Sequence, residues 1–141
     1  MNMYREFAAD LNQLLGGHLA VRITVDGYMP LSVEEIGIGG EGHRLVSLCQ
    51  YGEQNGDLMR DPDIVFMFQN PPHDPIAEPV SFRNDYIGLN QEVYRYDEHG
   101  KRTHLDTKLK LHLKEFAQIW FANLKEQGFF GYKAARTNLS P

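Results

Sequence analysis

The N-terminal part of the chain changes from a helical to a strand pattern of apolar positions. Between Tyr4 and Leu15, apolar residues recur at three- and four-residue spacing, which predicts a short amphipathic helix. Gly16-Gly17 can end this helix, because glycine tolerates the left-handed conformation of a helix cap. From residue 19 to 25 apolar residues alternate with others, and this two-residue period predicts a half-buried strand.

The middle of the chain alternates between short apolar runs and turn residues. Asp26-Gly27 is a hairpin signal, and the next strand changes phase at Glu34-Glu35, which predicts a bulge or bend. Prolines between Asn70 and Pro75 predict a loop, since proline cannot donate to a strand ladder. Residues 97–100 predict another hairpin turn. The strands expected after the first are 29–38, 44–51, 64–68, 79–89, 91–96 and 101–104.

The longest helical pattern lies near the C-terminus. Asp106 stands near its start, where the helix dipole favours an anion, and Gly128 follows its end as a plausible cap. Ala117 and Phe121 widen its apolar stripe. The residues of that stripe are Leu105, Leu109, Leu113, Phe116, Trp120 and Leu124.

The order of these elements predicts one α+β domain over residues 1–141, with 128–141 as a candidate flexible tail. Consecutive short connections favour an antiparallel meander sheet of about five or six strands over parallel crossovers. An antiparallel sheet with one solvated face needs helices on the other. The N-terminal helix and the long C-terminal amphipathic helix are therefore expected to pack on one face of the sheet.

Composition narrows the class of protein without naming a function. Hydrophobic residues make up 42% of the 141 residues and charged residues 23%, as is ordinary for a globular chain. A net charge of -5 argues against an exposed nucleic-acid groove, which needs Lys and Arg. The N-terminus lacks a secretory signal, and the single Cys49 suits a reducing compartment, so a cytoplasmic location is the default expectation.

The polar segment before the predicted strand 64–68 is the part of the chain most like a site. It could form a catalytic cleft, a binding surface, or a structural turn that ends at Asp61-Pro62. Its spacing does not complete a calcium loop, because the ligand positions and the closing glutamate are missing. We predict binding residues, and no catalytic residue, among Glu53, Asn55, Asp57, Arg60, Asp61 and Asp63, together with Arg83 and Asp85.

Other familiar constellations are incomplete in this chain. None of the six histidines has the spacing of a zinc site, and no serine lies in a nucleophile elbow. The glycine-rich segment 37–42 lacks the Lys-Ser/Thr of a phosphate loop, so a hairpin connection is the better interpretation. We therefore predict no metal and no cofactor.

Two further surfaces have both a structural and a functional interpretation. The lysines of the last helix, Lys108, Lys110, Lys114 and Lys125, form either a solvated face or a modest basic patch. The aromatic residues Phe82, Tyr86, Tyr94 and Tyr96 form either cross-strand core pairs or, on an open sheet face, a platform for a partner.

Three segments resemble a family of small uncharacterised bacterial proteins carried on conjugative elements, plasmids and phages. They are Tyr28–Ile36, Tyr51–Phe66 and Ala77–Gly88, the last followed by Gln91-Glu-Val93. The most specific part is the Gly-Asp-Leu-Met-x-Asp-Pro-Asp run at 56–63. The resemblance covers about half the chain and implies a mobile-element context, and hence a role in transfer, maintenance or counter-defence. It implies no activity, cofactor or catalytic residue.

These observations favour a non-enzymatic accessory protein that binds another macromolecule, which we expect to be a protein. One alternative is a small enzyme that uses Asp57, Asp61 or Asp63 with Arg83 and Asp85. Another is a weak nucleic-acid contact through the lysine-bearing helix. No membrane partner is expected.

Overall fold

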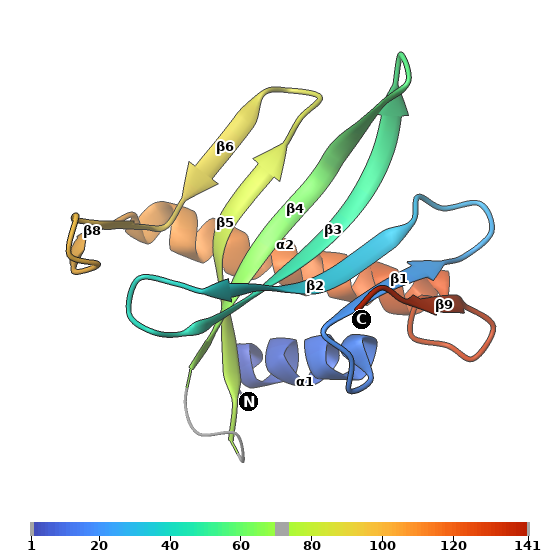
Figure 1. Ribbon diagram of the computed structural model, residues 1–141, viewed down its shortest axis with the longest axis horizontal. Helices are drawn as coiled ribbons and strands as arrows, with labels where there is room; N and C mark the ends of the chain where they lie inside the picture. The colour runs from blue at the N-terminus through green and yellow to red at the C-terminus, as the bar shows by residue number, and fades with distance from the viewer. Residues whose placement is uncertain (1, 70–73, 141) are drawn as a thin grey trace.

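Two helices and nine strands make up the described part of the chain, residues 2–69 and 74–140 of the computed structural model (Figure 1). Most of the predicted loop at 70–75 lies outside the described residues. In chain order the elements are α1 (Met3–Leu15), β1 (Ala20–Thr24), β2 (Leu31–Ile38), β3 (Arg44–Gln54), β4 (Asp57–Gln69), β5 (Ile76–Asn84), β6 (Leu89–Glu92), β7 (Tyr94–Tyr96), β8 (Arg102–Leu105), α2 (Thr107–Gln127) and β9 (Ala135–Asn138).

Seven of the described strands form one antiparallel sheet in the order β6-β5-β4-β3-β2-β1-β9. Strands β1 to β6 follow chain order, so the predicted antiparallel meander is confirmed. Strands β7 and β8 form a separate hairpin around the predicted turn at 97–100. The strand count is higher than the about five or six expected from apolar patterning.

Strand β9 is an element that the apolar pattern did not predict. It lies within 128–141, the candidate flexible tail, and pairs with β1 at the edge of the sheet. All four of its residues are exposed, so no alternation of apolar and polar positions marks it in the sequence. Backbone pairing with the free edge of β1 forms this strand, and side-chain burial contributes little.

The polar segment 52–62 consists of two strand ends and a tight turn, which corrects the expectation of a longer turn. Only Asn55-Gly56 separates β3 from β4, and their φ angles of 53° and 86° suit a two-residue hairpin turn. Pro62 lies inside β4, where Asp61 and Pro62 together oppose the single residue Gln50. Proline is tolerated at such a bulge because no ladder donor is needed there.

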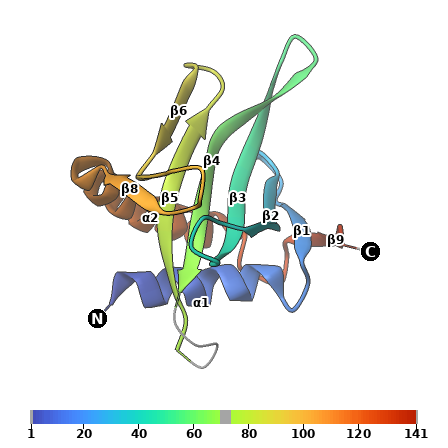
Figure 2. The same ribbon diagram turned by 60° about the vertical axis from the view of Figure 1, so that its left-hand side comes forward.

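One face of the sheet shares its core with both helices. Phe7 of α1 stacks on Phe121 of α2 at 5.5 Å between ring centroids, and both rings contact Phe66 of β4. In Figure 1, α2 passes behind the strands, and Figure 2 shows the β3–β4 and β5–β6 hairpins extending beyond the helices. One row of this core runs across five strands through Val21, Val33, Leu48, Ile64 and Phe82.

The helix ends lie where the capping residues predict. The side chain of Asp106 accepts a hydrogen bond from the Leu109 backbone N–H at 2.9 Å and so caps α2. Gly16 and Gly128 end the two helices in the left-handed conformation, with φ of 58° and 98°. Leu105 belongs to β8 and is half exposed, so the buried stripe of α2 begins at Leu109.

Candidate functional site

The face of the sheet opposite the core row, which we call the open face, carries two neighbouring rows of mixed side chains. Since side chains alternate along a strand, residues next to the core row point the other way. The central part of this face carries small polar side chains that are little exposed to solvent: Ser47, Cys49 and Ser81 are all buried. One row is Ser32, Cys49, Asp63, Arg83 and Asn90, and the other is Glu34, Ser47, Val65, Ser81 and Glu92.

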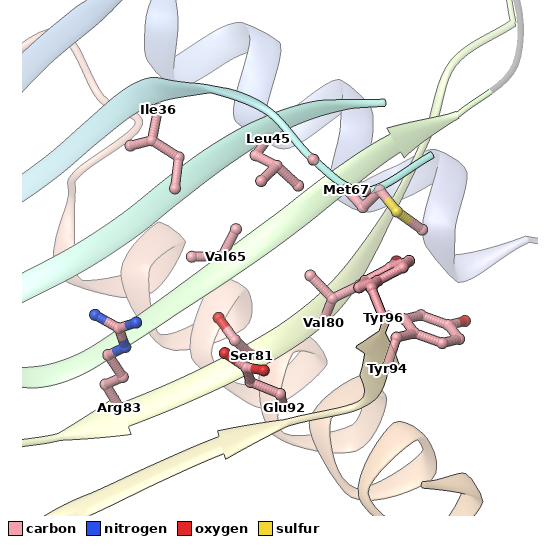
Figure 3. A pocket seen from close by; sticks show the side chains of 12 residues that line it. Ile36, Leu45, Val65, Met67, Val80, Ser81, Arg83, Glu92, Tyr94 and Tyr96 are labelled. Atoms are coloured by element: carbon pink, nitrogen blue, oxygen red, sulfur yellow. The ribbon is translucent and has the colours of Figure 1, made fainter. Parts of the chain in front are cut away.

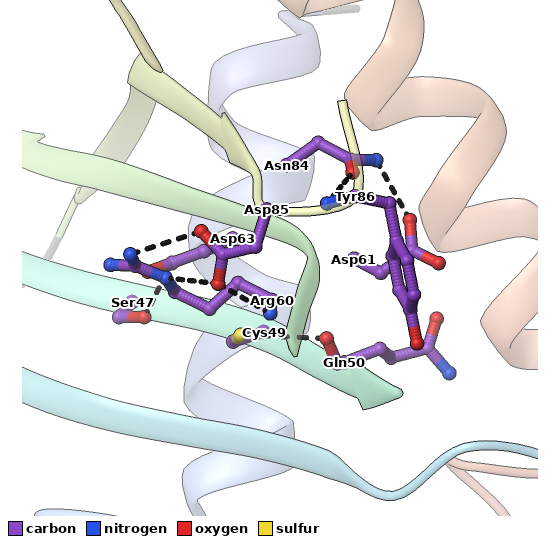
Figure 4. Close-up of polar contacts among 9 residues, drawn as sticks. All are labelled: Ser47, Cys49, Gln50, Arg60, Asp61, Asp63, Asn84, Asp85 and Tyr86. Atoms are coloured by element: carbon purple, nitrogen blue, oxygen red, sulfur yellow. Dashed lines mark hydrogen bonds and ion pairs between the residues drawn. The ribbon is translucent and has the colours of Figure 1, made fainter. Parts of the chain in front are cut away.

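A set of polar contacts holds the β5–β6 turn, residues 85–88, against β4 (Figure 4). Arg60 donates from Nε and Nη2 to the two oxygens of Asp85 at 3.0 and 3.1 Å, and its backbone N–H donates to the same carboxylate at 2.8 Å. Asn84 donates to Asp61 at 2.8 Å. The hydrogen bonds from Arg60 lower the pKa of Asp85 below its usual value, because they favour the ionised carboxylate.

Tyr86 adds an aromatic contact to this turn. Its hydroxyl lies over Gly52 of β3 so closely that a Cβ at that position would stand 2.2 Å from the oxygen. Together with the Arg60–Asp85 and Asn84–Asp61 contacts, this packing ties the β5–β6 turn to both strands of the β3–β4 hairpin. We call these residues, Gly52, Arg60, Asp61, Asn84, Asp85 and Tyr86, the turn lock.

Asp63 lies beside the turn lock in a less solvated position. Ser47 donates to its Oδ1 at 2.7 Å. Burial raises the pKa of Asp63, while the Ser47 hydrogen bond and the charges of Arg83 and Arg60 partly oppose that rise. Burial also raises the pKa of the neighbouring Cys49 thiol to about 12, so this cysteine is a poor nucleophile at neutral pH.

The predicted binding residues fall into two groups that the structure does not bring together. Glu53, Asn55 and Asp57 lie at the exposed tip of the β3–β4 hairpin. The remaining five are gathered where β4, β5 and the β5–β6 turn meet, and they are Arg60, Asp61, Asp63, Arg83 and Asp85.

A pocket of about 260 Å³ opens on the same face, beyond Arg83 (Figure 3). Apolar side chains from β2, β3, β4 and β5 line it, together with Tyr94 and Tyr96 of β7. Ser81, Arg83 and Glu92 supply its polar groups. The apolar lining residues are Ile36, Leu45, Val65, Met67 and Val80.

Most of this pocket lining was not singled out from the sequence. A usable signal was present in the unbroken apolar run Ile64–Phe68, because a strand buried on both faces shows no alternation. Val65 and Met67 of that run face the pocket, while Ile64 and Phe66 belong to the core. Of the predicted aromatic platform, Tyr94 and Tyr96 reach the pocket, whereas Phe82 packs edge-on against Phe116 of α2 at 5.3 Å.

The β2–β3 turn and the β7–β8 hairpin form one wall of the pocket by close contact. A Cβ on Gly40 would stand 2.7 Å from the ring of Tyr96, so the two segments touch only because residue 40 lacks a side chain. Glu41 and Arg102 form an ion pair across the same junction at 2.7 Å. The glycine-rich segment therefore permits close packing of a wall, consistent with its interpretation as a hairpin connection.

Three of the four lysines of α2 contact other residues of the chain. Lys110 donates to Glu78 at 3.3 Å and to the Tyr94 hydroxyl at 3.0 Å, and Lys125 pairs with Asp10 at 3.0 Å. The ammonium of Lys114 lies 5.5 Å from the centre of the Tyr4 ring. These contacts give the lysines a structural role on α2.

Two features are absent from the described part of the chain. No group of three or more His, Cys, Asp or Glu side chains within 2–69 and 74–140 is placed to hold a metal ion. Neither described helix combines the length and the hydropathy needed to cross a membrane.

Comparison with known proteins identifies a family and no relative of known activity. No curated protein and no solved structure matches the chain. Residues 2–130 match a family described as a domain of unknown function (DUF6908). The match extends from α1 to just beyond α2, so it includes the turn lock and the pocket and leaves out β9. The chain therefore belongs to the DUF6908 family.

Proposed function

We propose that this protein is a cytoplasmic accessory protein of a mobile genetic element, and that it binds another protein through the open face of its sheet. The observation that carries the proposal is the apolar pocket beside Arg83 on that face. A sheet face that holds partly exposed apolar and Tyr side chains near charged groups has the composition of a protein-binding surface. The mobile-element context rests on the resemblance of the three sequence segments described above.

The arrangement of carboxylates favours binding over catalysis. The carboxylates of Asp85, Asp61 and Asp63 each accept a hydrogen bond from another residue of the chain, namely Arg60, Asn84 and Ser47 in that order. These contacts hold neighbouring strands and the β5–β6 turn together. An acid–base pair would instead need two carboxyl groups that face a common cleft. Asp57, the fourth candidate, is exposed at the hairpin tip.

The charge distribution also favours a protein over a nucleic acid as partner. The chain has a net charge of -5, and Lys110 and Lys125 of the lysine-bearing helix are paired with carboxylates. Nucleic-acid affinity depends on cations that neutralise phosphates, and these two lysines already neutralise acids of the chain.

Affinity capture with two matched surface variants tests the proposal. Ile36 on the open face and Ile119 on α2 are both exposed, at 48% and 62%, so Asp at either position should be compatible with folding. We expect a partner that the wild-type chain captures from a lysate of its own organism to be lost with Ile36→Asp and kept with Ile119→Asp.

Three results would argue against this function. One is the absence of any partner specific to the wild-type chain. Another is a partner lost with Ile119→Asp and kept with Ile36→Asp, which would place the binding surface on α2. The third is capture of nucleic acid that weakens steeply with salt. Circular dichroism spectra of both variants should match the wild type, which separates lost binding from lost folding.

A further inference from the structure

We propose that the pocket on the open face binds the C-terminal residue of the partner protein, with its carboxylate on Arg83 and its apolar side chain among Val65, Met67 and Val80. This inference rests on the proposed function for the claim that the partner is a protein. It adds the chemistry of the group that is recognised and the residue that recognises its charge.

Arg83 supplies the positive charge of the pocket lining. Within the described residues, its buried Nε has no hydrogen-bond partner. Asp63, its cross-strand partner on β4, accepts from Ser47 and lies within the field of the Arg83 charge, and Asp85 is held by Arg60. Buried donors are normally paired, and the planar guanidinium matches a carboxylate with two parallel hydrogen bonds.

The rest of the pocket suits an apolar group directly beside that charge. Val65 lies next to Arg83 on the open face, and Met67 and Val80 continue the surface away from it (Figure 3). Met67 is buried although it points away from the core row, because it belongs to a second apolar cluster that includes Val93 and Tyr94. The Tyr94 hydroxyl donates a hydrogen bond to Glu78, so the part of Tyr94 that contributes to the pocket lining is its apolar ring.

The volume of the pocket favours a terminal residue over an acidic side chain. About 260 Å³ lies below the usual range for drug-sized ligands, so the occupant is small. In a C-terminal residue, the carboxylate and the side chain branch from one Cα, and both can enter the same small pocket. An Asp or Glu side chain carries its carboxylate at its end and brings no separate apolar group.

Glu92 on the rim adds selectivity against more highly charged ligands. It lies on β6, opposite Ser81 in register, and is exposed. A single carboxylate can be neutralised by Arg83, whereas the second charge of a phosphate group would meet Glu92 without a matching cation. The pocket should therefore prefer monoanions.

NMR titration of the full chain with small probes tests this chemistry without a known partner. N-acetyl-L-leucine and N-acetyl-L-phenylalanine represent a C-terminal residue, N-acetyl-L-leucinamide lacks the charge, and N-acetylglycine lacks the apolar side chain. We expect saturable shifts at Val65, Ser81 and Arg83 with the first two probes. The amide and the glycine probe should bind about tenfold more weakly or not at all, since each lacks one of the two interactions.

Variants at two arginines on the same face locate the charge that matters. Arg83→Gln should weaken N-acetyl-L-leucine binding by about tenfold or more, as expected for loss of a charge-assisted pair. Arg22→Gln removes the same charge from β1, outside the pocket lining, and should leave affinity unchanged. Arg83→Lys keeps the positive charge but cannot form the two parallel hydrogen bonds of a guanidinium, so it should give an intermediate affinity. Since the probe series on the wild type needs no variant, a poorly folded Arg83→Gln does not prevent the test.

Several outcomes would overturn the inference. Two concern the probes: N-acetyl-L-leucinamide binds as tightly as N-acetyl-L-leucine, or inorganic phosphate binds more tightly than N-acetyl-L-leucine. A third is equal affinity of Arg83→Gln and the wild type for N-acetyl-L-leucine. The fourth is a set of pocket shifts that depend on protein concentration alone, which would indicate that a second copy binds this face. If the probes bind as expected but no partner is captured, the proposed function fails while the pocket chemistry stands. If a captured partner still binds with its C-terminus amidated, the function stands and this inference fails.

Discussion

At the scale of single residues, the acidic candidates of the sequence have separate roles. Arg60, Asp61 and Asp85 belong to the turn lock, and Asp63 lies half-buried beside it. The most specific part of the family resemblance, 56–63, contains the β4 half of that lock. Arg60 and Asp61 of this run therefore have a structural role, and no catalytic function is needed to explain them.

The Arg60–Asp85 pair should contribute measurably to stability. Arg60→Ala, Asp85→Ala and the double variant form a cycle in which we expect a coupling of about 1 kcal/mol in urea unfolding, because the pair is bidentate and hydrogen-bonded to the backbone. The pKa of Asp85 is lowered in the folded chain. The coupling is therefore complete above the ordinary value of about 3.9 and lost as the pH falls below it toward the folded pKa.

The Arg5–Asp74 pair provides the control for this cycle. Its side chains are 57% and 45% exposed, and it has a single contact at 3.0 Å. An exposed pair of this kind is worth little, so its coupling should be close to zero. Equal coupling energies for the two pairs would show that the Arg60–Asp85 pair stabilises the fold no more than an exposed surface pair does.

Asp63→Asn should stabilise the protein at neutral pH or leave its stability unchanged. Because burial raises the pKa of Asp63 in the folded chain, the unfolded chain ionises first as the pH increases. The wild type therefore loses stability as the pH rises from about 4, the ordinary value, through the folded pKa. Asparagine still offers an oxygen to Ser47, so the variant should not show this loss.

Thermal unfolding of Asp63→Asn and wild type from pH 3 to 8 measures the effect. The melting temperatures of the two proteins should be equal at the acid end of this range and should differ increasingly as the pH rises. A variant that is less stable than the wild type at pH 7 would show instead that the charge of Asp63, balanced by Arg83, stabilises the fold.

At the scale of elements, hairpins that dock on one another shape the open face. The β5–β6 turn is held on the β3–β4 hairpin by the turn lock, and the β2–β3 turn is held on the β7–β8 hairpin by the Gly40–Tyr96 contact. The pocket is bordered by Gly40 and Tyr96 of the second junction. Its shape depends on contacts between elements that are separated in sequence.

Gly40→Ala tests whether close approach is what the β2–β3 turn requires. A Cβ there would meet the Tyr96 ring itself, so we expect a loss of about 1–3 kcal/mol in the free energy of unfolding, as for an overpacked contact. Adding Tyr96→Ala should remove most of that penalty, because the clashing ring is gone. If Gly40→Ala lowers the free energy of unfolding equally with and without the Tyr96 ring, the loss comes from the backbone at residue 40 and not from a clash with that ring.

Gly52→Ala is the matched case at the other junction. Its Cβ would meet mainly the hydroxyl end of Tyr86, a flexible and partly exposed side chain that can move aside. The penalty should therefore stay below about 1 kcal/mol.

At the scale of the whole molecule, the C-terminal segment completes the sheet. Strand β9 pairs with β1, and Arg136 donates to the backbone oxygen of Leu14 at the end of α1. These contacts join the last described strand to the first helix and the first strand. The match to the family ends at residue 130, so this closure lies outside the family pattern.

Removal of residues 135–141 should leave a folded but less stable and more associative protein. The core residues lie outside this segment, so circular dichroism should keep its native shape. The free edge of β1 would then be a template for intermolecular pairing, and we expect concentration-dependent association in size-exclusion chromatography. Arg136→Ala keeps β9 and should remain monodisperse under the same conditions as the wild type.

Local patterns predicted elements where burial or capping is periodic. The buried stripe of α2, the caps at Asp106 and Gly128 and the bulge after Glu35 all follow from short-range sequence. Strand β9 could not be predicted in this way, because its residues are exposed and its only signal is a partner strand over a hundred residues away. The Asn55-Gly56 turn was predictable from its residue types and was obscured by the surrounding acids.

The sequence by itself determined the α+β class, the antiparallel meander and the two helix boundaries, because these depend on periodicity and capping within a few residues of each other. Only the tertiary structure decided what the acidic residues do. It placed Arg60 against Asp85 across two strands, left Glu53 and Asp57 in solvent, and put Arg83 at the edge of an apolar pocket. The physical reason is that pairing, desolvation and pocket formation depend on which strands become neighbours, and residue spacing alone does not contain that information.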